Sequence, residues 1–226
     1  MTADSTEPGA APAPDTSDMA AVHRVYRQAL DAAPRLVGDA ADADAARVGV
    51  VGSYYYNVLR FLEVHHQGED HLVTPLLVER CAPADVETVQ RVAAQHKPVE
   101  APIDGADAAL QVWRQDPGAA TTKQLVSDLG ALQDVLIPHL DEEEETVVPL
   151  AAAHMSAEEW GALPGHGLAH FQGDNIWLIL GLIREQMNDT QRQLMLEHMP
   201  PPVADAWRNT GEAEFTAFIT EVRSPL

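Results

Sequence analysis

The strongest constraint on the fold is a motif that occurs twice, a histidine and a glutamate four residues apart on an apolar helical face. In the first copy these residues are His65 and Glu69. At helical spacing they share one face with apolar residues: Val58, Phe61, Leu62, Leu72 and Leu76. An ionisable pair on such a face costs free energy unless it is paired or bound to a metal.

The second copy repeats the internal spacing of the first. His139 and Glu143 lie four residues apart, again on an apolar helical stripe. A proline follows each histidine by ten residues, Pro75 after His65 and Pro149 after His139. The two units therefore form a short internal repeat. One such unit is a weak signal, whereas two on apolar stripes indicate a shared site.

The first copy contains a histidine doublet, which leaves two choices of inward residue. His65 lies with Glu69 on the more apolar face, whereas His66 lies with Asp70 on a more mixed face. The apolar stripe and the proline offset both favour His65. We therefore expect His66 to lie outside the ligand set or to be exposed, and the His66→Ala variant to keep most of its metal.

The composition favours an all-α protein. The chain has 226 residues, of which 46% are hydrophobic, so it can bury a sizeable core. Long runs of alternating β-branched residues are missing, which favours helices over strands. The formal net charge of −21 argues against nucleic acid and anionic membranes as partners, because both are polyanions.

Cysteine usage and hydropathy predict a cytoplasmic protein. The single cysteine, Cys81, excludes an internal disulfide and a cysteine-based zinc or iron–sulfur site. No signal-peptide pattern opens the chain, and no apolar run is long enough to span a membrane.

The order of the elements predicts three regions. Residues 1–17 lack basic and large apolar residues after Met1 and are expected to form a flexible tail. Residues 18–155 are predicted to form a four-helix bundle, with Pro98 and Pro102 kinking or interrupting its third helix. Residues 156–226 are predicted to form a helical extension packed on the bundle, with a short first helix that ends at Pro164.

All four long helices of the predicted bundle carry a histidine on the apolar stripe. His23 lies on the first and His96 on the third, in addition to the two histidines of the repeat. A single such histidine is more often a hydrogen-bonded core residue, but four in equivalent places indicate metal ligands. Imidazoles and carboxylates together suit iron and can hold two cations between facing helices.

These residues resemble the hemerythrin-like (HHE cation-binding) domain over about residues 18–155. The resemblance implies an antiparallel four-helix bundle that holds two iron ions, a non-haem di-iron centre with an oxo or hydroxo bridge. It also implies the metal ligands: His23, His65, His96 and His139 as imidazole ligands, with Glu69 and Glu143 as bridging carboxylates.

The third helix departs from the oxygen-carrying members of this family, which have two histidines four apart there. Here Glu100 follows His96 at that spacing; it could bind metal, hydrogen-bond a ligand or face solvent. We expect Glu100 and Tyr26 to serve in catalysis, Glu100 as a proton shuttle, although core packing is the more common role of a tyrosine such as Tyr26.

The expected function is to bind or reduce small oxidants, namely O2, hydrogen peroxide or NO. Peroxide decomposition is favoured over reversible O2 carriage, because anionic oxygen donors stabilise ferric iron. The alternative is an iron- or oxygen-responsive regulatory protein that acts through a protein partner. His166 and His170, four apart in the extension, are expected to have a surface or interface role rather than to bind metal. The sequence sets no oligomeric state.

Overall fold

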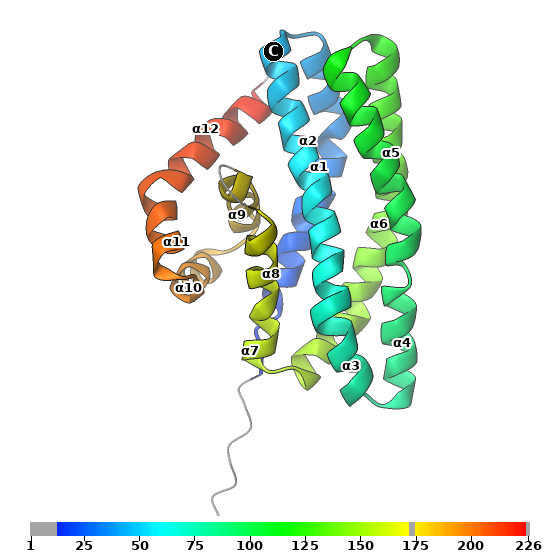
Figure 1. The fold of residues 1–226 in the computed structure, drawn as a ribbon, viewed down its shortest axis with the longest axis vertical. Helices are drawn as coiled ribbons and strands as arrows, with labels where there is room; N and C mark the ends of the chain where they lie inside the picture. The colour runs from blue at the N-terminus through cyan, green and yellow to red at the C-terminus, as the bar shows by residue number, and fades with distance from the viewer. Residues whose placement is uncertain (1–12, 172–174, 225–226) are drawn as a thin grey trace, which may run out of the picture.

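The computed structural model describes residues 13–171 and 175–224, and every regular element in these ranges is a helix. Four long helices lie side by side (Figure 1): α1 (Ser17–Ala41), α2 (Ala45–Gly68), α5 (His96–Gln115) and α6 (Ala119–His154). Both α1 and α5 contact α2 and α6. Of the tail predicted for residues 1–17, residues 1–12 lie outside the described ranges.

The helix that carries the first repeat unit changes its hydrogen-bonding pattern within the unit. After α2, Glu69–Val73 forms a π-helical turn, η1, and Thr74–Arg80 continues as α3. The Thr74 amide donates to the carbonyl of Glu69, five residues earlier. Pro75 has no amide hydrogen, so the regular helical ladder is interrupted next to this turn. Single π-turns of this kind are frequent at functional sites.

The third helix is interrupted at a different place from the one predicted. It consists of α4 (Pro83–Ala93) and α5, and the break falls at residues 94–95, directly before His96. An interruption at Pro98 or Pro102 is wrong, because α5 runs through both residues. Pro98 lies in the first turn of α5, where its missing amide costs no helical hydrogen bond. Pro102 lies inside the helix.

The rest of the described chain forms short helices beside the four long ones (Figure 1). They are α7 (Ala157–Trp160), α8 (Ala162–His170), α9 (Asn175–Glu185), α10 (Asp189–His198), α11 (Pro201–Ala206), the π-turn η2 (Trp207–Gly211) and α12 (Glu212–Arg223). Helices α8, α9 and α12 contact α2, and α9 also contacts α1.

The first helix of this region differs from the one predicted to end at Pro164. Ser156 begins α7 with the expected capping box, since its side chain and that of Glu159 each accept from the other's backbone amide. However, Pro164 does not end the helical region, because α8 runs through it. The proline is the third residue of α8, a position with no helical amide bond to lose.

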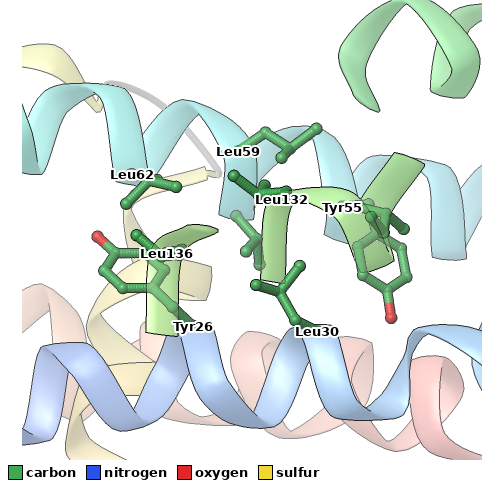
Figure 2. A pocket seen from close by; sticks show the side chains of 9 residues that line it. Tyr26, Leu30, Tyr55, Leu59, Leu62, Leu132 and Leu136 are labelled. Atoms are coloured by element: carbon green, nitrogen blue, oxygen red, sulfur yellow. The ribbon is translucent and has the colours of Figure 1, made fainter. Parts of the chain in front are cut away.

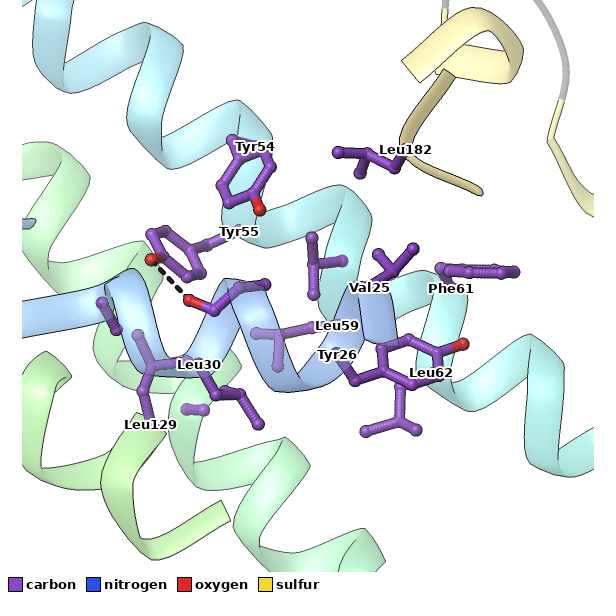
Figure 3. Packing of buried hydrophobic residues seen from close by; sticks show 14 of the residues in the cluster. Val25, Tyr26, Leu30, Tyr54, Tyr55, Leu59, Phe61, Leu62, Leu129 and Leu182 are labelled. Carbon is purple, nitrogen blue, oxygen red and sulfur yellow. Dashed lines mark hydrogen bonds between the residues drawn. The ribbon is translucent and has the colours of Figure 1, made fainter. Parts of the chain in front are cut away.

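Apolar side chains fill the interior between the long helices. In the main core, the Tyr55 hydroxyl donates to the Ala29 carbonyl at 3.0 Å (Figure 3). Figure 2 shows an apolar layer with Tyr26 towards one end and Tyr55 towards the other; its side chains leave no volume for a water molecule. None of the helices described above is long and apolar enough to cross a membrane.

Candidate metal centre

Seven side chains from the four long helices and η1 converge in the interior, and they fall into two groups. Within each group the potential ligand atoms all lie within 4.8 Å of one another. The first group is His23, His65, Glu69 and Glu143, and the second is His66, His96 and His139. The structure thus brings together all six residues predicted as ligands and adds His66.

The two glutamates lie between the groups. Glu69 has Oε1 at 3.1 Å from His65 Nε2 in its own group and Oε2 at 3.5 Å from His96 Nε2 in the other. Glu143 has Oε2 at 3.5 Å from His23 Nε2 and at 3.7 Å from His139 Nε2. Each carboxylate therefore faces donors of both groups, as a bridging ligand must.

The donor atoms are buried and poorly satisfied within the described chain. Glu69 is 2% exposed and Glu143 is 3% exposed. Five donor atoms have no hydrogen-bond partner: both oxygens of Glu69, Oε2 of Glu143, and Nε2 of His66 and of His139. Burying such groups without compensation costs free energy. Metal cations would compensate it, and the set of imidazole nitrogens and carboxylate oxygens suits iron.

Outer acceptors orient three of the histidines. Each of these histidines points its Nδ1 at an oxygen outside the cluster, which turns Nε2 inward: His23 to Glu144 at 2.8 Å, His96 to Asp70 at 2.9 Å and His139 to Gln95 at 3.2 Å. A carboxylate can only accept, so the Nδ1 atoms of His23 and His96 carry the hydrogen. Such contacts fix the ring orientation and make Nε2 a better metal donor.

The outer acceptors are themselves held. Arg27 donates to Glu144 at 3.1 Å and pairs with Asp141 at 2.9 Å, while the Gln95 side-chain amide donates to Glu142 at 2.6 Å. The hydrogen bond from His23, with a smaller contribution from Arg27, lowers the pKa of the Glu144 carboxyl. Glu144 is therefore kept in the ionised form that accepts from the imidazole.

Burial sets the protonation of the cluster in the metal-free chain. It lowers the pKa of His65 and His66 well below the usual value and that of His139 to about 3, and the neighbouring histidines lower each further. Burial, followed by the charge of Glu143, raises the pKa of Glu69. His65, His66 and His139 are thus neutral, which is the form that binds a metal.

Tyr26 lies at the edge of the cluster, beside His65. It is 1% exposed, its ring centroid lies 5.6 Å from that of His65, and its hydroxyl has no hydrogen-bond partner in the described chain. Burial, followed by the charges of Glu69 and Glu143, raises the pKa of its phenol. Tyr26 therefore remains a protonated hydrogen-bond donor beside both carboxylates.

Glu100 is not among the residues that the structure brings together. Its side chain is 57% exposed and pairs with Lys97 on the outer face of α5. The buried side of this helix runs through His96, Val99 and Ile103, at intervals of three and four residues. Of the three roles left open for Glu100, facing solvent is the one that the structure shows.

His66 is the ligand candidate that the sequence analysis missed. It was expected to be exposed or outside the ligand set, but it is buried, and the expectation of exposure is wrong. Consecutive helical residues point about 100° apart, and in a bundle both can face inward when they approach different neighbours. His65 faces His23 on α1, with 3.2 Å between their Nε2 atoms, whereas His66 stacks on a histidine of α5. The doublet itself was the available signal.

Comparison with known proteins agrees with this geometry. Residues 15–151 match the family described as the hemerythrin HHE cation binding domain. No curated protein matches the chain, and no solved structure matches it. The match covers more than half of the 226 residues and includes all seven converging side chains. The chain therefore belongs to the hemerythrin HHE cation-binding domain family.

Proposed function

We propose that this chain is a non-haem di-iron protein that decomposes hydrogen peroxide, and that it reacts with O2 or NO at the same centre. The observation that carries the proposal is the convergence of five histidines and two glutamates whose buried donor atoms lack protein partners. In this proposal the four long helices form the antiparallel four-helix bundle of the family.

The two groups of ligands would each hold one iron. His23 and His65 would bind one metal and His66, His96 and His139 the other, with the two glutamates shared between them. When bound, an iron pair would relay two electrons from one molecule of hydrogen peroxide, which is oxidised to O2, to a second molecule, which is reduced to two molecules of water. The first group offers two imidazoles and the second offers three, so the first group would leave its metal more open to a small oxidant.

Tyr26 supports turnover over reversible O2 carriage. Cleaving the oxygen–oxygen bond of peroxide to form water requires protons at the oxygen atoms, whereas carriage requires that bound O2 be left intact. The phenol of Tyr26 is protonated and buried, and its hydroxyl has no hydrogen-bond partner in the described chain. It lies close enough to Glu69 and Glu143 that their charges raise its pKa. In this proposal Tyr26 donates a hydrogen bond to the reacting oxygen.

The second candidate, an iron- or oxygen-responsive regulator, is favoured by one contact. Helix α8 lies against Gly68, the residue directly before Glu69, and a Cβ atom at Gly68 would lie only 3.2 Å from the side chains of Leu163 and His166. If Glu69 shifted when the metal is lost, the neighbouring helix α8 would therefore have to move as well. In this candidate function, α8 would change its exposure to a protein partner when the iron is removed.

The proposal is tested by measuring iron content together with peroxide consumption. We expect about two irons per chain, as in other two-metal bundles, and O2 release from hydrogen peroxide. His139→Ala should lose iron and activity, whereas His154→Ala, on the same helix but outside the cluster, should keep both. A folded wild-type protein that binds no iron would exclude the di-iron reading. An iron-loaded protein that leaves peroxide intact but binds O2 reversibly would favour carriage.

A further inference from the structure

Three further histidines gather where α8 meets η1. His71 lies in η1, while His166 and His170 lie one turn apart on α8. The ring centroids of His166 and His170 are 4.4 Å apart, and those of His71 and His166 are 6.3 Å apart. None of these residues belongs to the centre described above.

We propose that His71, His166 and His170 bind one divalent transition-metal ion of the zinc class, as a second site separate from the di-iron centre. Histidines at positions i and i+4 of one helix present both imidazoles to the same ion, as in helical zinc motifs. A third histidine from another element completes three protein ligands, which leaves one position of a tetrahedral ion for water.

The hydrogen bonding of the three residues leaves donor atoms available. His170 donates from Nδ1 to the His166 carbonyl at 2.8 Å, which leaves its Nε2 with the free electron pair. Nε2 of His166 is buried without a partner in the described part of the chain. Burying a nitrogen without a hydrogen bond costs free energy, and coordination to a cation would compensate it.

Charge suits a cation here, although the nitrogens of the three rings are not gathered as closely as the donor atoms of the centre described above. Burial lowers the pKa of His166, and His170 and His71 lower it further, so its imidazole is neutral and able to bind. His71 and His170 are exposed, so both rings can rotate to bring their nitrogens to the roughly 2.0–2.1 Å that zinc requires. The chain's net charge of −21 attracts cations to the surface.

A bound ion at this place would join the extension to the repeat unit. Helix α8 already packs on α2, and the ion would add a bond from α8 to η1, the turn that contains Glu69. The imidazole-only donor set favours zinc, copper or nickel over magnesium and calcium, which prefer oxygen ligands.

The experiment is a calorimetric titration of the iron-loaded protein with Zn²⁺. We expect one additional Zn²⁺ per chain, and X-ray absorption at the zinc edge should show nitrogen ligands. His71→Ala and His170→Ala should each weaken binding at least about tenfold, since even changes outside the ligand sphere cost roughly 10–100-fold. Both residues are exposed, so neither change removes core packing. Iron content should stay constant in His170→Ala.

The matched control is His198→Ala, which removes an exposed histidine on α10. It should leave Zn²⁺ affinity unchanged. The proposal fails if the iron-loaded wild-type protein takes up no Zn²⁺. It also fails if His71→Ala binds Zn²⁺ as the wild type does, or if His198→Ala loses as much affinity as His170→Ala. Titration with Mg²⁺ should give no binding at this site.

Discussion

His66 stacks on His96, with their ring centroids 4.2 Å apart and their planes inclined by 12°. Both residues are buried. The pair links α2 to α5, just as the contact of His65 with His23 links α2 to α1. One histidine doublet thus connects the helix to two neighbours through two groups of ligands.

The stacking of His66 on His96 changes the prediction for the variant His66→Ala, which the sequence had suggested would keep most of its metal. His66→Ala should lose iron as His65→Ala does, from about two irons per chain to one or fewer, because each removes an imidazole from a different group of the proposed two-metal site. Iron analysis of the purified variants checks the prediction. His154→Ala is the control, since His154 ends α6 away from the cluster. An iron content in His66→Ala equal to that of the wild type would show that His66 lies outside the ligand set.

The outer acceptor of His23 should affect metal affinity without binding metal itself. Glu144→Gln keeps the size of the side chain but removes the charge that holds the imidazole hydrogen at 2.8 Å. Such a change typically costs about 10–100-fold in affinity, measurable by competition with a chelator. Glu145→Gln, at the neighbouring exposed position, should have no effect. Equal affinities for the two variants would mean that Glu144 does not tune the site.

The repeat made much of the site predictable. His65, Glu69, His139 and Glu143 followed from the spacing and the apolar stripes, because a charged group among apolar neighbours needs a compensating partner. The same argument found His23 and His96 on their own helices. These six candidates needed only local periodicity, which a sequence displays directly.

The placement of His66 and Glu100 could not be predicted in this way, because it depends on tertiary contacts and on where α5 begins. A stripe analysis assigns one inward face to a helix, so it had to choose between His65 and His66, although α2 has ligand-bearing neighbours on two sides. For Glu100, the resemblance to the family left three roles open, and the sequence could not choose among them. The chain breaks directly before His96, and α5 buries Val99 and Ile103, so Glu100 faces solvent.

Tyr26→Phe should separate metal binding from chemistry. The ring stays in the core and no protein hydrogen bond is lost in the described chain, so fold and iron content should be retained. Peroxide turnover should fall by about 10²-fold or more, the typical contribution of a positioned proton donor. Tyr55→Phe is the control, because it removes only the hydrogen bond to the Ala29 carbonyl. It should cost about 1 kcal/mol of stability and leave turnover unchanged.

Metal removal should make the stability of the protein sensitive to mild acid. In the metal-free chain His65, His66 and His139 have pKa values below the unfolded value of 6.5. At a pH between the pKa of a histidine in the folded chain and its pKa in the unfolded chain, the unfolded chain binds more protons than the folded chain. The free energy of unfolding therefore falls as pH decreases below about 6.5, by up to ~1.4 kcal/mol per histidine and per pH unit. This contribution to stability is fully present above pH 6.5.

Glu69 acts in the opposite sense, because its pKa is raised from 4.5. Above that value the unfolded chain releases a proton that the folded chain keeps, so this residue lowers stability as pH rises. Below about pH 6 the effect of the three histidines on stability is larger than that of the one glutamate. The free energy of unfolding therefore falls as pH decreases, as the histidines alone predict.

Urea unfolding of the metal-free protein at pH 5.5 and 7 should therefore show lower stability at pH 5.5. His66→Gln removes one of the three titrating groups and should reduce the difference, whereas His198→Gln should not. A metal-free wild-type protein equally stable at both values would show that these histidines are not buried as described.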